Sequence, residues 1–192
     1  MGNPVREIGI AGMEVEYDHL FKIVLLGDTA VGKTCLMLRL CEDKFVEQHN
    51  RTVVVDLGIR KYLNIFGLKI KLQIWDPPPP TKINTLEANY YRGAHGVIIL
   101  HDPSHPLDNL KFWLREIDCS SWEHVYKLIV ANKCDLKNNE QIDDVAQLAE
   151  GLGIPFVNIS AKDSINCEEC IVNLVWEILL NCELAAQRNY GS

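Results

Sequence analysis

The chain has 192 residues, of which 47% are hydrophobic and 23% charged, and its formal net charge is −7. This length and balance fit one globular domain with a full core, and the negative charge argues against a nucleic-acid binder, which needs an excess of Lys and Arg. Seven scattered cysteines form no disulfide framework and are typical of a reducing compartment. No apolar run approaches the roughly 20 residues of a membrane-spanning helix. We therefore expect a cytoplasmic protein. We also expect it to be a monomer.

The pattern of apolar residues predicts three segments. Residues 1–18 show no clear period and are expected to form a loosely held extension. In residues 19–185 apolar runs alternate with amphipathic stretches, which predicts an α/β domain: a mostly parallel six-stranded sheet with helices on both faces. Residues 186–192 are expected to form a C-terminal tail.

The expected strands are short apolar runs, and the expected helices show amphipathic periodicity. Asp108 precedes its helical pattern as an N-cap would, and Gly151 fits a helix stop. Cys167 and Cys170 form a CxxC pair in a helical stretch without a second ligand pair, so a helical pair is favoured over a metal site. The expected strands are Phe21–Leu26, Val53–Ile65, Lys69–Trp75, Gly96–His101, Lys127–Ala131 and Pro155–Ile159, with a hairpin turn at 66–68; the expected helices are Gly32–Cys41, Asp108–Ile117, Ile142–Gly151 and Cys167–Leu184.

A phosphate-binding loop is predicted between the first apolar strand and the first helix. Residues 27–34 match G-x-x-x-x-G-K-[ST], in which glycines let backbone N–H groups point at phosphate oxygens and the helix N-terminus favours an anion. Lys33 would neutralise the β and γ phosphates, and the Thr34 hydroxyl would ligate Mg²⁺. The phosphate-binding candidates are Gly27, Asp28, Thr29, Ala30, Val31, Gly32, Lys33, Thr34 and Cys35.

Two later loops predict a guanine site. Asn132-Lys133-Cys134-Asp135 follows a strand as N-K-x-D, and a carboxylate at Asp135 can accept from both the N1–H and the 2-amino group of guanine. Lys133 would lie along the base and Asn132 would brace the phosphate loop. A backbone N–H of the loop Ser160-Ala161-Lys162 would meet guanine O6, with Lys162 packed on the base. All these segments follow strands, and ligands of open α/β sheets bind at the carboxyl ends of strands.

These motifs resemble those of the Ras superfamily, and Rab proteins in particular, over residues 17–183. Lys71-Leu72-Gln73-Ile74-Trp75-Asp76 and Tyr90-Tyr91-Arg92-Gly93-Ala94 are similar to Rab segments. The resemblance implies a GTP/GDP switch that meets exchange factors and recruits effectors in vesicle traffic, on the cytosolic face of endomembranes. It also implies that Phe45 stacks on guanine, that Thr52 binds Mg²⁺ and the γ-phosphate, and that Asp76 holds Mg²⁺ through water.

The resemblance further implies an effector-facing apolar triad. Leu57, Trp75 and Tyr90 match that triad by position, although its first member is usually aromatic. Plain core packing is an equally acceptable interpretation of these three residues.

Two departures from the Rab pattern bear on activity. Pro77, Pro78, Pro79 and Pro80 replace Thr-Ala-Gly-Gln, so that Pro80 stands where the water-orienting Gln is expected, and no catalytic residue is assigned. Val54 replaces a Gly of the first switch. Rab proteins also end in a prenylatable cysteine tail; the last cysteine here is Cys182, in a helical segment, so membrane attachment is expected only if such a tail lies outside this sequence.

Three functions remain open at this point. The first is a switch that hydrolyses GTP slowly, because Pro80 cannot orient a water. The second is a GTP-binding interaction module that no longer cycles. A P-loop kinase for a small metabolite is a remote third, since the N-K-x-D motif weighs against it. The tetraproline tract also has the polyproline form that SH3 and WW domains bind, although a rigid surface loop is the simpler interpretation.

Overall fold

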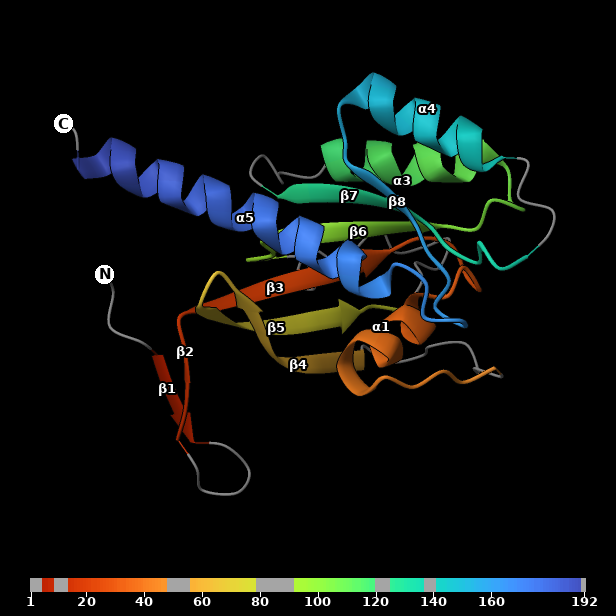
Figure 1. Cartoon of the computed structure of the whole chain (residues 1–192). Helices are drawn as coiled ribbons and strands as arrows, with labels where there is room; N and C mark the ends of the chain where they lie inside the picture. Colours follow the sequence, from red (N-terminus) through yellow and green to blue (C-terminus); the bar gives the residue numbers. More distant parts are fainter. Residues whose placement is uncertain are drawn as a thin grey trace.

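The sheet is the central element of the computed structural model, which describes residues 5–8, 14–47, 56–78, 92–119, 125–136 and 141–190 (Figure 1). Six strands follow the order β4-β5-β3-β6-β7-β8. Neighbouring strands pair in parallel except β4, which is antiparallel to β5. The expected α/β fold is therefore confirmed. The strands are β3 (His19–Leu26), β4 (Asp56–Ile65), β5 (Leu68–Asp76), β6 (Gly96–His101), β7 (Tyr126–Ala131) and β8 (Phe156–Asn158).

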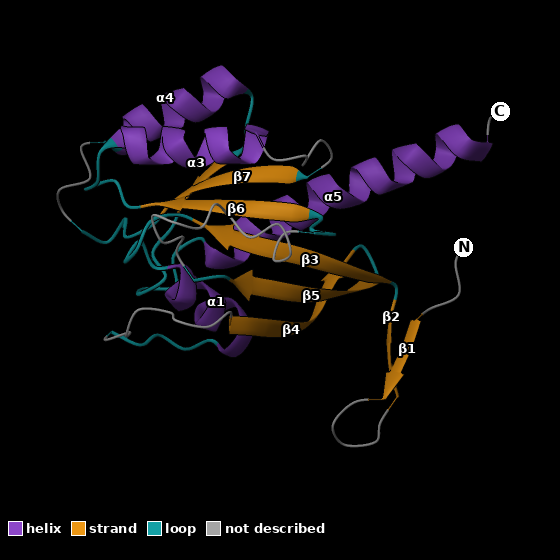
Figure 2. Ribbon diagram, turned by 180° about the vertical axis from the view of Figure 1, so that it is seen from behind, coloured by secondary structure: helices purple, strands orange, loops and turns teal. Residues whose placement is uncertain are grey.

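Helices cover both faces of this sheet (Figures 1 and 2). α1 (Lys33–Glu42) and α5 (Cys167–Tyr190) lie on one face, and α3 (Leu107–Cys119) and α4 (Ile142–Leu152) lie on the other. Alternate residues of β3 supply the two cores: Ile23 packs on the α1–α5 side and Val24 on the α3–α4 side. Because both faces are buried, such strands have the continuous apolar runs by which the sequence predicted them.

The β4–β5 connection is the expected hairpin turn. Phe66 and Gly67 have φ angles of 51° and 84°, the left-handed pair of a type I′ turn, and the Gly67 N–H donates to Asn64 Oδ1 at 3.0 Å. Phe66 is 85% exposed, and its ring lies 5.0 Å from that of Trp176 on α5.

The N-terminal segment contains more structure than the sequence predicted. β1 (Val5–Ile8) and β2 (Glu14–Tyr17) form a two-stranded antiparallel sheet of their own. Tyr17 is buried, and the Nζ of Lys71 lies 5.4 Å from the centre of its ring. Asp18 binds Lys69 of β5 twice, because its N–H donates to the Lys69 carbonyl at 2.8 Å and its carboxylate accepts from the Lys69 N–H at 2.7 Å. Strands of four residues are too short to show a period.

Two expected helix signals are wrong by a few residues. α3 begins at Leu107, so Asp108 is not the N-cap but an acidic residue of the first turn, where the helix dipole favours it. α4 ends at Leu152, and its C-cap is Gly153 rather than Gly151: Gly153 has a positive φ (65°), and its N–H donates to the Glu150 carbonyl at 3.0 Å. A neighbouring glycine misled the sequence-based assignment.

α5 is longer than predicted, since it continues to Tyr190 rather than ending at Leu184. Residues 186–190, expected in the C-terminal tail, are therefore helical. Cys167 and Cys170 are buried in this helix, and burial raises the pKa of the Cys167 thiol to about 11. Two buried, protonated thiols on α5 favour packing over metal binding. None of the described helices is long and apolar enough to cross a bilayer.

Candidate nucleotide-binding site

The loop between β3 and α1 approaches two neighbouring segments too closely for side chains at its glycines. Gly27 has a φ of 139°, and a Cβ there would lie 2.3 Å from the Leu100 carbonyl oxygen on β6. Gly32 has a φ of 97°, and a Cβ there would lie 2.3 Å from Asn132 Nδ2. Both positions therefore require glycine, and glycines at these positions allow the bend by which backbone N–H groups can line the mouth of such a loop.

Lys33 folds back over this loop. Its Nζ donates to the carbonyl oxygens of Gly27 at 2.9 Å and Asp28 at 2.7 Å, and the residue is only 8% exposed. Burial lowers the pKa of Lys33, while the carboxylates of Asp76 and Asp28 act to raise it. An ammonium group has three donors, so one remains for a phosphate oxygen at the loop mouth.

Thr34 and Asp76, two of the expected magnesium ligands, lie in contact with each other. The Thr34 hydroxyl, in the first turn of α1, donates to Asp76 Oδ2 at the end of β5, and Asp76 is fully buried. A hydroxyl and a carboxylate beside a phosphate loop are the hard oxygen ligands that Mg²⁺ prefers, so the residues fit the ion. The third expected ligand, Thr52, lies outside the described residues.

Asn132 joins the phosphate loop to the base loops. It is 2% exposed, its Nδ2 donates to the Val31 carbonyl at 2.8 Å, and its Oδ1 accepts from the Ala161 N–H at 3.1 Å. The first bond is the brace that the sequence predicted. The second bond, to the loop after β8, was not predicted, and it directs one of that loop's N–H groups to protein rather than to a ligand.

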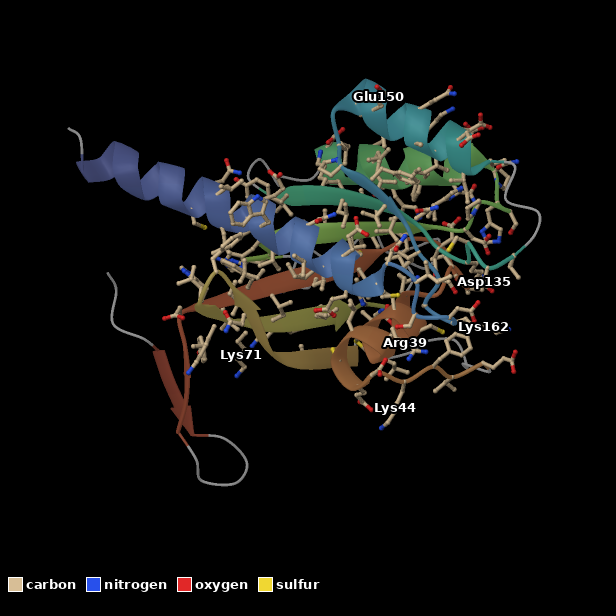
Figure 3. All side chains as sticks on the ribbon, viewed as in Figure 1. Arg39, Lys44, Lys71, Asp135, Glu150 and Lys162 are labelled. Carbon is tan, nitrogen blue, oxygen red and sulfur yellow. The ribbon has the colours of Figure 1, made fainter. Side chains whose placement is uncertain are left out.

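The side chain of Asp135 is oriented by a buried serine. The Ser160 hydroxyl donates to Asp135 Oδ1 at 2.7 Å and accepts from the Asp163 N–H at 3.0 Å. Ser160 is fully buried, so this arrangement is fixed by the fold. Figure 3 shows Asp135 and Lys162 at the same edge of the molecule, as expected of two base contacts.

Lys133 has a partner that the sequence did not reveal. Its Nζ lies 2.6 Å from Asp102 Oδ2, just past the end of β6, and its backbone has a positive φ of 68°. Burial acts to raise the pKa of Asp102, but hydrogen bonds from Lys133 and Ser104 outweigh it and the pKa is lowered. Asp102 therefore stays ionised and positions Lys133. In the sequence, Asp102 is a single acidic residue after a predicted strand, which is too weak a pattern to mark it as a site residue.

The Asp28 side chain is held from α3. Its carboxylate accepts from Asn109 Nδ2 at 2.5 Å and from Trp113 Nε1 at 2.8 Å. Sequence reasoning assigned Trp113 only to an amphipathic helix, because nothing in a local pattern links it to a loop far away along the chain.

The remaining base-site candidates lie on exposed segments. Phe45 is partly buried in the segment that follows α1. Lys162 is exposed, and its Nζ lies 3.8 Å from Glu47 Oε1. Their contact with a base stays a prediction.

Two members of the expected effector triad lie side by side. Leu57 on β4 pairs with Trp75 on β5, so both side chains lie on one face of the sheet. Leu57 is 47% exposed, and the Lys22 Nζ lies 4.3 Å from the centre of a Trp75 ring. The exposure of Leu57 speaks against plain core packing at that position. Tyr90 lies outside the described residues.

Half of the proline tract is described. Pro77 is buried and Pro78 half-buried, directly after the last residue of β5. Pro79 and Pro80 lie outside the described residues, as does Val54.

Fold and loops together define a P-loop α/β domain. The Ras family model matches residues 22–180. The chain is similar to "Ras-related protein RIC1" of Oryza sativa subsp. japonica, with 44% identity over 170 residues that cover 86% of this chain and 84% of the relative. It is also similar to "GTP-binding protein YPTM1" of Zea mays, with 45% identity over 164 residues, 83% of this chain and 78% of the relative.

The chain therefore belongs to the Ras family, and its relatives make it a Rab/Ypt-like small GTPase. Proteins of this family bind guanine nucleotides with Mg²⁺, hydrolyse GTP, and work through regulators and effectors. The expected family is thus confirmed.

Proposed function

We propose that this protein binds GTP and GDP at the carboxyl edge of its sheet and acts as a molecular switch in vesicle traffic that hydrolyses GTP unusually slowly. The observation that carries the binding proposal is the role of Asn132, which hydrogen-bonds both to Val31 of the phosphate loop and to Ala161 of the last base loop. One buried side chain holds together three loops that are far apart in sequence. This fits a single ligand that spans them.

Each proposed contact follows from the chemistry of its side chain. The loop from Gly27 to Cys35 would surround the phosphates with N–H groups, and Lys33 would neutralise their charge. Thr34 and Asp76, with Thr52, would hold Mg²⁺, which supplies a positive charge against the β and γ oxygens. Asp135 would read the N1–H and 2-amino groups of guanine, flanked by Phe45, Lys133 and the loop from Ser160 to Lys162.

Slow hydrolysis is proposed from the proline tract. A proline at position 80 offers no side-chain group that can orient the water attacking the γ-phosphate. Pro79 has no N–H to donate to that phosphate, and each proline biases the residue before it towards an extended form. The described part of the tract agrees with this bias, since Pro77 and Pro78 continue from β5 without a helical turn.

Single-turnover hydrolysis of bound GTP tests the proposal. The natural protein is expected to hydrolyse GTP well below the intrinsic rate of about 10⁻⁴ per second seen for Ras. A variant with Pro77→Thr, Pro78→Ala, Pro79→Gly and Pro80→Gln should gain at least about tenfold, because the N–H and the amide return. The matched control carries only Pro77→Thr and Pro78→Ala and should stay slow. Equal hydrolysis rates for the natural protein and the variant with four substitutions would contradict the proposal that the prolines slow hydrolysis.

The alternative is a GTP-binding interaction module that no longer cycles. The same prolines favour it, because a ligand shifts a conformation only through contacts that differ between its two states, and prolines can donate neither an N–H nor a side-chain group to a γ-phosphate. Effector binding separates the two functions: a switch binds its effector more tightly with GTP than with GDP, whereas a module that has stopped cycling binds both forms alike. Leu57 and Trp75, with Tyr90, are the proposed effector surface.

A further inference from the structure

Arg39 connects α1 to the loop that follows β8, although the two are far apart along the chain. Its Nε donates to the Ala161 carbonyl at 3.0 Å and its Nη2 to the Lys162 carbonyl at 3.1 Å. The Arg39 side chain is only 14% exposed, so it is held in place between the two segments. Figure 3 shows Arg39 beside Lys162, on the same side of the molecule as Asp135.

The other end of the guanidinium is anchored on its own helix. Nη1 donates to the carbonyl oxygen of Asp43 at 3.0 Å and to its carboxylate at 2.8 Å, where α1 ends. A guanidinium is a rigid, planar fork of five donors, so it can bind two successive carbonyls on one side and an anchor on the other. A lysine ammonium is a single point of three donors without this fork, so it could not hold both carbonyls and the anchor on the opposite side together.

Holding these carbonyls also fixes N–H groups. Because a peptide unit is planar and trans, the carbonyl of one residue and the N–H of the next point in opposite directions. The bond to the Ala161 carbonyl therefore orients the Lys162 N–H. The bond to the Lys162 carbonyl orients the Asp163 N–H, which donates to Ser160 Oγ at 3.0 Å.

This second peptide leads directly to the base-reading carboxylate. Ser160 Oγ, which accepts from the Asp163 N–H, donates to Asp135 Oδ1 at 2.7 Å. The chain of contacts runs from Arg39 through one rigid peptide and one buried hydroxyl to Asp135. Arg39 thus bears on both groups proposed to read guanine: the loop N–H facing O6 and the carboxylate facing N1–H.

We propose that Arg39 is a positioning residue for base recognition, which fixes the 160–163 loop against the helix that carries Lys33 and Thr34. The inference rests on the proposed guanine site and deepens it. All three guanidinium nitrogens of Arg39 donate to protein oxygens, so Arg39 would act on the base through the peptides that it holds and not by direct contact. Since its helix also carries the phosphate ligands, it holds the base loop at a set distance from the phosphate loop.

The test uses the full chain and two nucleotides, GDP and 6-thio-GDP. The sulfur of 6-thio-GDP is a poor hydrogen-bond acceptor, so this analogue has little to lose when the O6 contact loosens. Arg39→Ala is expected to weaken GDP binding by about tenfold, the effect of losing a charge-assisted hydrogen bond, and 6-thio-GDP binding by less. Arg39→Lys should fall between Arg39→Ala and the natural protein.

Two controls make the outcome specific. Asp43→Asn leaves the bonds of Arg39 to the Ala161 and Lys162 carbonyls in place and should keep GDP affinity within about twofold, since the Asp43 carboxylate is exposed to solvent. Lys111→Ala removes an exposed cation on α3 and should change neither affinity. Equal losses for GDP and 6-thio-GDP would overturn the positioning role, because a general loosening of the fold affects both nucleotides alike.

The outcomes also separate this inference from the function on which it rests. If the natural chain bound no GDP, the guanine site itself would be wrong. If the natural chain bound GDP and the Arg39 variants bound it equally well, only the positioning role would fail. If circular dichroism showed that Arg39→Ala had lost its helices, Arg39→Lys would be used in its place. The proposal would then be rejected if the ratio of GDP affinity to 6-thio-GDP affinity in Arg39→Lys were the same as in the natural protein.

Discussion

Selection of the base is expected to depend on Asp135, whose carboxylate the protein already holds on one side through Ser160. Asp135→Asn places an amide donor against the two donors of guanine. We predict that GDP binding weakens by about 1–3 kcal/mol or more, because buried polar groups are then left unpaired. Binding of xanthosine diphosphate, which presents a carbonyl at that edge, should strengthen. Titration calorimetry with GDP and with xanthosine diphosphate measures both changes in affinity.

The neighbouring Asp163 gives a matched control for that experiment. Its side chain is exposed, and it contributes to the site through its backbone N–H, so Asp163→Asn should leave both affinities unchanged. A guanine preference that survived Asp135→Asn would contradict the base site.

Sequence reasoning found those site residues whose chemistry fixes both their type and their spacing. Gly27, Gly32 and Lys33 belong to one short loop, and Asp135 belongs to a four-residue motif, so local patterns suffice. Arg39 was missed because its partners are backbone carbonyls, which any sequence provides. Asp102 and Trp113 were missed for a related reason: only the folded sheet brings them to Lys133 and Asp28.

At the level of elements, α3 supports the phosphate loop through Trp113. This side chain is 4% exposed, and its indole N–H donates to a charged carboxylate, that of Asp28. Trp113→Phe keeps most of the packing but removes the donor. We predict that the free energy of unfolding falls by about 1.5–3 kcal/mol, the usual effect of a lost hydrogen bond to a charged group. GDP affinity should fall as well, because the loop loses one of its supports.

Urea unfolding and a GDP titration on the same samples check this prediction. Trp176→Phe is the matched control: Trp176 is half-exposed on α5 and packs against Phe66, at a distance from the loop. Its replacement should cost little stability and no GDP affinity. If both substitutions lowered GDP affinity alike, the Asp28 contact would not be the cause.

The elements were predicted well wherever both faces of a strand or one face of a helix are buried. β6 has the bounds that the sequence predicted, Gly96–His101, because it lies inside the sheet with apolar neighbours on both faces. Prediction was weaker where the sequence shows no clear pattern of apolar and polar residues. β1 and β2 have four residues each, too few for an alternation to stand out, and the apolar period of α5 fades in the sequence after Leu184, although the helix continues to Tyr190.

For the whole molecule, nucleotide binding and folding should be thermodynamically linked. The loops joined by Asn132 can close around a nucleotide only in the folded state, so binding stabilises that state. With Mg²⁺ and GDP at a thousand times the Kd, the gain is about 4.1 kcal/mol. For a domain of this size this corresponds to a rise in Tm of roughly 8–16 °C.

Thermal unfolding monitored by circular dichroism measures this shift. ADP at the same concentration is the control, and it should give a much smaller rise because its base lacks the paired donors that Asp135 accepts. Chelating the metal with EDTA should remove part of the gain obtained with GDP, since the Thr34 and Asp76 oxygens then lose their ion. An equal rise with ADP and GDP would contradict guanine selectivity.

The direction of α5 offers a spectroscopic use. The helix runs from the loop beside the base site to the opposite end of the sheet and beyond it (Figure 2), and its 24 residues correspond to roughly 36 Å of helix. Cys182, an exposed free thiol about two thirds of the way along this helix, can carry a fluorescent dye. Energy transfer between this dye and a fluorescent guanine nucleotide would then run along the length of the helix. Its efficiency would report the arrival and departure of nucleotide in real time, from a label placed well clear of the loops that bind it.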